Sequence, residues 1–120
     1  MWTIELFETQ SGDCPTRNFI SKLNRKTELD FVRRKIDLLR QYGNELVLMG
    51  REHAAHLTDG IFELRIQVHR KQLRILYFFF FDEKIILSHG IKKEDKVPPA
   101  EIDKARRNRD FYFKTHERQK

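Results

Sequence analysis

Three cationic side chains in the second half of the sequence suggest the chemistry of this protein. Arg65, Arg74 and Lys92 each lie in a segment where apolar and polar residues alternate. If these segments are neighbouring β-strands, the three cations share one face of a small sheet. Like charges side by side repel, so packing alone does not favour this arrangement, and the surrounding sequence offers no obvious set of neutralising carboxylates. A polyanion favours it, because guanidinium groups bind phosphate in bidentate fashion.

The elements that must position these cations are three strands, expected at residues 61–68, 73–81 and 85–92. Alternation with a period of two is typical of half-buried strands. Turns at residues 69–72 and 82–84 would connect the strands as antiparallel hairpins.

The register of the first hairpin decides how the two arginines meet. We expect Val68 opposite Leu73, which makes Arg65 and Arg74 diagonal neighbours with Cα atoms roughly 7–8 Å apart. Two guanidiniums at that spacing can hold one phosphate between them. The other face is then a continuous apolar surface made of Phe62, Leu64, Ile66, Val68, Leu73, Ile75, Tyr77 and Phe79.

The position of the lysine depends on the second turn. A three-residue turn at residues 82–84 directs Lys92 to the arginine face, opposite Arg74, and directs His89 into the core. A two-residue turn exchanges the two faces and brings Lys93 beside the arginines. The first turn is favoured because the second buries Ser88 and exposes aliphatic side chains.

The remaining elements complete an α+β fold in one domain, residues 1–120. Residues 2–7 alternate as a strand, and Pro15 opens a short helix. A second helix begins near Leu29 and ends near Gly43, and residues 44–59 are read as a loop with a short helical or strand piece. We therefore expect an N-terminal helical hairpin packed on a small antiparallel sheet, with a basic C-terminal helix at about residues 100–112.

Composition limits the class of protein. The net charge is +6, and the whole excess lies in residues 61–120, which hold fifteen Lys/Arg and nine Asp/Glu, against nine of each in residues 1–60. Such asymmetry is typical of a nucleic-acid or acidic-protein partner, although a solvated surface gives it too. The single Cys14, the lack of a signal-peptide pattern and the longest apolar run of seven residues favour a cytoplasmic protein with no membrane contact.

Further candidates for phosphate contact are less specific. The turn His69-Arg70-Lys71 and a basic helix face containing Arg106 can both touch phosphates. His53 and His56 have the spacing of half a metal site, but no matching ligands accompany them, so no metal or other cofactor is expected.

Four segments together resemble the phage-derived HigB-like toxins of the RelE/ParE superfamily. They are residues 59–65, 74–78, 89–93 and 98–105. The resemblance implies the toxin of a type II toxin–antitoxin pair, whose HigB and RelE relatives cut messenger RNA on the ribosome without a metal. It implies Arg65, Arg74 and Lys92 as the catalytic residues. It also implies a helix-turn-helix repressor as the antitoxin.

The expected chemistry is attack of a ribose 2′-hydroxyl on the adjacent phosphorus, with fixed cations stabilising the developing negative charge. The RNA-contact residues expected around this centre are Lys93, His69, Arg70, Lys71, His56, Arg106 and Tyr112. Two alternatives stay open. The ParE branch shares the fold and inhibits DNA gyrase without catalysis, and a ribosome- or RNA-binding module needs no catalysis either.

Overall fold

The computed structural model describes residues 1–93 and 96–116, without the side chain of Lys93. The elements and their bounds are, in order, β1 (Thr3–Leu6), α1 (Pro15–Ser21), α2 (Leu29–Tyr42), the 3-10 turn η1 (Gly43–Glu45), α3 (Leu46–Met49), β2 (Ala54–Thr58), β3 (Ile61–Val68), β4 (Lys71–Phe80), β5 (Lys84–Lys93) and α4 (Pro99–His116). The three central strands and α4 lie where the sequence predicted them. In the described residues no helix is long and apolar enough to cross a membrane.

The sheet is mixed, which corrects the predicted antiparallel sheet. Its five strands lie in the order β1-β5-β4-β3-β2, and β1 is parallel to β5 while the other neighbours are antiparallel. Parallel pairing needs a long connection, and here the strands between β1 and β5 in the sequence provide it. The edge strand β2 comes from the segment that was read mainly as a loop.

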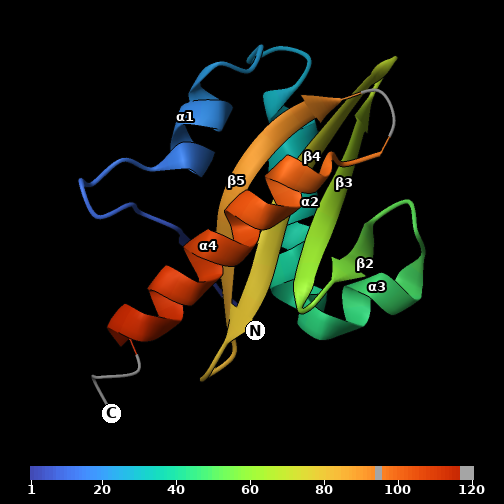
Figure 1. The fold of residues 1–120 in the computed structure, drawn as a ribbon. Helices are drawn as coiled ribbons and strands as arrows, with labels where there is room; N and C mark the ends of the chain where they lie inside the picture. Colours follow the sequence, from blue (N-terminus) through green and yellow to red (C-terminus); the bar gives the residue numbers. More distant parts are fainter. Residues whose placement is uncertain (94–95, 117–120) are drawn as a thin grey trace.

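The predicted N-terminal helical hairpin is also wrong. Figure 1 shows α1 and α2 on one face of the sheet and α4 across the other. α1 packs on β5 and α2 packs on β3, so each of these helices has its own place on the sheet. The connection between the two helices has its own hydrogen bonds, in which the Asn24 side chain accepts the backbone N–H groups of Lys26 and Thr27, and Glu28 accepts the backbone N–H of Asn24.

Each face of the sheet has its own apolar core. The α2-side core contains the eight apolar side chains predicted for one face of the first hairpin, with Val32 and Leu39 of α2. The α4-side core contains Ile61, Leu76 and Phe78 together with Ala105 and Tyr112 of α4. Burial on both faces explains why β4 is nearly continuously apolar.

The turn of the β3–β4 hairpin consists of residues 69–70, whereas the predicted register required a two-residue turn at residues 70–71 or a four-residue loop at residues 69–72. Val68 pairs with Lys71 across a two-residue turn in which His69 has φ 56°. Arg65 therefore lies directly opposite Arg74 and not diagonal to it. The predicted register was wrong by two residues, but an even shift leaves every side chain on its predicted face.

A β-bulge changes the second half of β5. Tyr77 pairs with Leu87, whereas Leu76, the residue before Tyr77 on β4, pairs with His89. Ser88 is therefore the additional residue. One extra residue reverses the alternation of the side chains that follow it. Before the bulge Ile85 and Leu87 lie on the α2 side, as predicted.

After the bulge the predicted orientation is wrong. His89 and Ile91 lie on the α4 side, while Gly90 and Lys92 lie on the α2 side. Gly90 fits this place because a Cβ there would lie 2.2 Å from the ring of Phe19 in α1. A larger residue would push α1 away from the sheet.

Candidate nucleic-acid interface

A groove of about 540 Å³ lies on the α4 side of the sheet, over β2, β3 and β4. We call it the arginine groove, and its lining residues are Arg51, Ala55, His56, Leu57, Glu63, Arg65, Gln72, Arg74, Lys96, Val97 and Ile102. This set includes four Arg or Lys side chains and a single carboxylate. The groove therefore has an excess of positive charge, which suits an anionic ligand.

The carboxylate is Glu63, which lies between the two arginines. Its Oε1 is 2.7 Å from Arg74 Nε and 3.4 Å from Arg65 Nε, and its side chain is 5% exposed. This neutralising carboxylate was not predicted from the sequence. Alternation contained the signal, because residues two apart on a strand share a face and Glu63 is two residues before Arg65. Glu63 offsets the repulsion between two arginines that lie directly opposite each other.

Each nitrogen of the Arg74 guanidinium lies beside an oxygen atom of the protein. Its Nη1 donates to the backbone oxygen of Leu73 at 3.0 Å and its Nη2 donates to Gln72 Oε1 at 2.7 Å, while Nε faces Glu63. Burial lowers the pKa of Arg74, Glu63 opposes that shift, and Arg65 adds to it. An arginine stays protonated even so, which makes Arg74 a fixed positive charge at the bottom of the groove.

Arg65 is the more accessible of the two arginines. Its side chain is 26% exposed, against 10% for Arg74. Its Nη1 donates to the backbone oxygen of Arg51 at 3.0 Å. A guanidinium has five N–H donors, so Arg65 can make these contacts and still donate to a phosphate in the groove.

The two candidate lysines do not join the arginines as predicted. Lys92 lies on the α2 side, where its Nζ is 3.9 Å from Glu28 Oε2. Lys93 pairs with Gln72 through its backbone, and its side chain is outside the described residues. Lys96 and Arg51 line the groove instead, and neither was singled out from the sequence. Both belong to segments without a clear period.

His89 is a core histidine, as predicted, but on the opposite face. It is 2% exposed, with Nδ1 2.8 Å from Ser88 Oγ and Nε2 3.0 Å from Glu101 Oε1. Asn108 of α4 donates to the same serine hydroxyl at 3.0 Å. Burial lowers the pKa of His89, Lys104 adds to the shift and Glu101 opposes it. The contacts of Ser88 and His89 with Asn108 and Glu101 fix the bulge to α4.

The other predicted contact residues are dispersed. His56 borders the arginine groove, but its ring lies on the α2-side face, 5.0 Å from that of Phe62, with which it pairs across β2 and β3. His69, Arg70 and Lys71 lie at the tip of the β3–β4 hairpin. Arg106 lies 3.6 Å from Asp59 Oδ2 and 2.8 Å from Asp103 Oδ1, so it helps hold the β2–β3 turn against α4.

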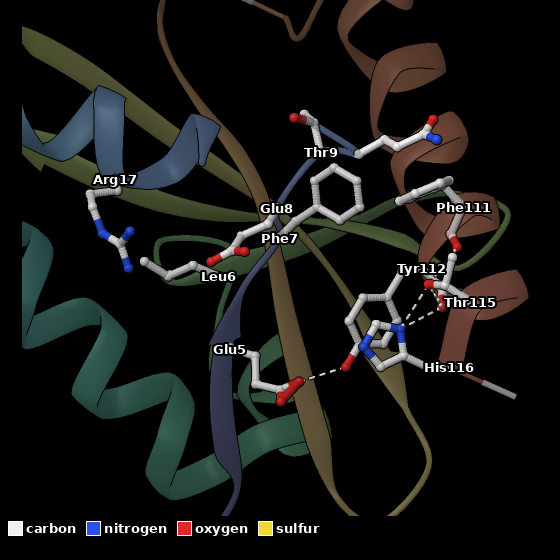
Figure 2. A pocket seen from close by; sticks show the side chains of 11 residues that line it. Glu5, Leu6, Phe7, Glu8, Thr9, Arg17, Phe111, Tyr112, Thr115 and His116 are labelled. Atoms are coloured by element: carbon white, nitrogen blue, oxygen red, sulfur yellow. Dashed lines mark hydrogen bonds between the residues drawn. The ribbon is translucent and has the colours of Figure 1, made fainter. Parts of the chain in front are cut away.

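Tyr112 lies far from the arginines, in a second groove of about 580 Å³ between β1 and α4. Figure 2 shows its hydroxyl pointing toward Glu5, to which it donates at 2.5 Å, and the ring of His116 stacked on it. Burial raises the pKa of Tyr112, and the Glu5 carboxylate adds to that shift. The residue packs the α4-side core and does not reach the arginine groove.

These features define a small domain with helices on both faces of a five-stranded sheet and a cationic groove beside one edge strand. The chain belongs to the family described as "Phage derived protein Gp49-like (DUF891)", whose model matches residues 18–110. No curated protein matches the chain. The family is phage-derived and toxin-like, which agrees with the broader part of the sequence-based prediction.

Proposed function

We propose that this chain is the toxin of a type II toxin–antitoxin pair and cleaves messenger RNA on the ribosome. The observation that supports this function most strongly is the arginine groove, where Arg65 and Arg74 lie directly opposite each other and share one carboxylate. Membership of a phage-derived, toxin-like family supports the toxin class. The proposed partners are the ribosome with its message and a cognate antitoxin, for which a helix-turn-helix repressor is the expected class.

The chemistry assigned to the groove is transesterification. The 2′-oxygen bonds to phosphorus, the bond to the 5′-oxygen breaks, and the 2′-proton passes to a base while the leaving oxygen gains a proton. Negative charge increases on the phosphate oxygens in the transition state. Preorganised donors stabilise that charge without reorganising during the reaction. Arg65 contacts the phosphate, and Arg74 keeps the local charge and the position of Glu63 fixed.

Among the described residues that line the groove, no free general base lies beside the arginines. The imidazole of His56 lies on the α2-side face beside Phe62 and accepts the backbone N–H of Gly60 through Nε2 at 3.4 Å. Slow cleavage by the isolated chain is therefore part of the proposal. The ribosome supplies the orientation of the RNA, and proximity alone can account for a large part of a rate enhancement.

The experiment is induced expression in growing cells, followed by mapping of new 5′ ends in messenger RNA. Translation-dependent ends that disappear with Arg65→Ala support the proposal. Arg17→Ala is the matched control, since Arg17 is an exposed arginine of α1 beside the distant groove of Figure 2. Growth arrest with intact transcripts and gyrase-linked DNA breaks would contradict cleavage and favour the ParE-like reading.

A further inference from the structure

An exposed phenylalanine with an arginine over its ring lies on the other side of the β3–β4 hairpin. Phe31 of α2 is 39% exposed. The guanidinium carbon of Arg34 is 5.9 Å from the centre of its ring, and the ring of His69 lies 6.4 Å away, edge to face. We call this area the Phe31 surface. It consists of Phe31 with Arg34 and His69, which contact its ring, of Arg70 and Lys71, which follow His69 in the chain, and of Lys92, which meets Lys71 at Glu28, three residues before Phe31.

The two lysines of the Phe31 surface converge on one buried carboxylate. Glu28 is 2% exposed, and its Oε2 is 3.2 Å from Lys71 Nζ and 3.9 Å from Lys92 Nζ. The backbone N–H of Asn24 lowers the pKa of Glu28, burial opposes that shift, and Lys71 and Lys92 add to the lowering. The lysine side chains are 61% and 53% exposed, so their other N–H donors face solvent.

Exposure of a phenylalanine does not by itself indicate a binding site. Phe81 is more exposed, at 50%, but it lies in the β4–β5 turn next to Asp82 and Glu83. Carboxylates there repel an anionic ligand. Phe31, in contrast, is an accessible aromatic ring with an arginine 5.9 Å from its centre and a histidine ring beside it, while Phe81 packs against the rings of Phe80 and Phe113.

An aromatic ring beside exposed cations is the arrangement that binds single-stranded nucleic acid, because bases stack on the ring while Lys and Arg contact the phosphates. We infer that the Phe31 surface is a second RNA-binding site, which takes one unpaired base on Phe31 and the adjoining phosphates on Arg34, Arg70 and the two lysines. This inference extends the proposed function, since the same RNA would occupy the arginine groove.

The two RNA sites are close along the chain. Lys71 and Gln72 are neighbours on β4 and point to opposite faces, and Gln72 binds Arg74 in the arginine groove. Arg74 is three positions after Lys71, which corresponds to about 10 Å along a strand. A single RNA strand can therefore pass round the hairpin tip from one site to the other, with Arg70 at the turn between them.

The test measures stacking directly. The probe is an oligoadenylate with one 2-aminopurine, whose fluorescence falls when the base stacks, titrated with protein bearing Arg65→Ala to prevent cleavage. We expect quenching, and Phe31→Ala added to that protein should remove it and weaken binding roughly tenfold. Phe31→Tyr should retain both, which shows that the ring matters and that the fold is intact. Phe81→Ala is the matched control and should change neither.

Equal binding and quenching with Phe31→Ala would overturn the inference, even if Arg65-dependent cleavage is found in cells. Conversely, quenching that depends on Phe31 in a chain that never cleaves messenger RNA would leave the second site standing and reject the nuclease. A loss of binding with Phe31→Tyr as well would also overturn the stacking role.

Discussion

On both faces of the β3–β4 hairpin two cations lie close together, but the two pairs differ in how exposed they are. On each face one buried carboxylate gathers two cations, Glu63 with Arg65 and Arg74, and Glu28 with Lys71 and Lys92. The arginines are 26% and 10% exposed, whereas the lysines are 61% and 53% exposed. The first pair is fixed by its surroundings, while the second keeps its side-chain freedom.

This difference in exposure indicates that the two surfaces have different roles, one in cleavage and the other in binding. Charges held rigidly in a partly buried site can favour a transition state over a ground state. Exposed lysines on flexible stems bind phosphate as point charges and contribute affinity that salt readily weakens. The arginine groove is therefore suited to the reaction and the Phe31 surface to holding the strand.

The largest expected effect is on the rate of RNA cleavage, which should depend on the arginine groove and not on the Phe31 surface. Arg65→Ala should lower single-turnover cleavage of ribosome-bound message by about 10²–10³, the usual result of removing one preorganised donor. Affinity for single-stranded RNA should change much less, because the Phe31 surface remains. Rapid quenching and end mapping measure the rate, and anisotropy measures the affinity. A parallel loss of both would mean that the groove serves only for binding.

The second effect concerns stability. Glu63→Gln should lower the free energy of unfolding by about 3 kcal/mol, because it leaves two partly buried guanidiniums without their carboxylate. Glu28→Gln should cost only about 1 kcal/mol, since its lysine partners are solvated and a glutamine still accepts the N–H of Asn24. Urea denaturation of both variants provides the comparison. Equal losses would show that exposure of the cations is unimportant.

The third effect is a pH dependence. The pKa of Glu28 is lower in the folded protein than its usual 4.5, so its contribution to stability is fully present above that value. It is lost as the pH falls through the lower pKa of the folded state. The stability difference between the wild type and Glu28→Gln should therefore shrink on acidification, measured by thermal melts from pH 7 to pH 3. A constant difference would contradict the shift.

The smallest effect tests the position of Lys92. Lys92→Ala should weaken binding of single-stranded RNA about two- to threefold and reduce the slope of log affinity against log salt by about 0.7, the value for one phosphate contact. Single-turnover cleavage at saturating RNA should stay within about twofold of the wild type. A loss comparable to that of Arg65→Ala would restore Lys92 to the catalytic site.

The sequence predicted what depends on alternation and missed what depends on counting residues between strands. The eight apolar side chains of the first hairpin lie on one face as predicted, because the error in the turn was two residues. The faces predicted for Lys92 and His89 were wrong, because the prediction did not include the one-residue bulge at Ser88. No local signal marks that bulge, which is stabilised by Asn108 from α4.

The edges of the sheet depend on tertiary contacts. The parallel pairing of β1 with β5 joins residues about eighty apart, and β2 is a short strand in a weakly patterned segment. Glu63 was visible from the strand period, yet only the structure shows that one of its oxygens faces both arginines. The arginine face itself could be predicted, and the groove around it could not.

The bulge at Ser88 is the one place in the paired part of β5 where a residue has no partner on β4. A strand has two possible phases, and the extra residue switches β5 from one to the other halfway along. Deleting Ser88 would leave a regular strand in which His89 still pairs with Leu76 and Lys92 still pairs with Leu73, so the side chains after the deletion would keep their present faces. A one-codon deletion at the bulge would therefore leave the cationic face in place, whereas the same deletion in a regular part of β5 would exchange the faces of the residues on one side of it.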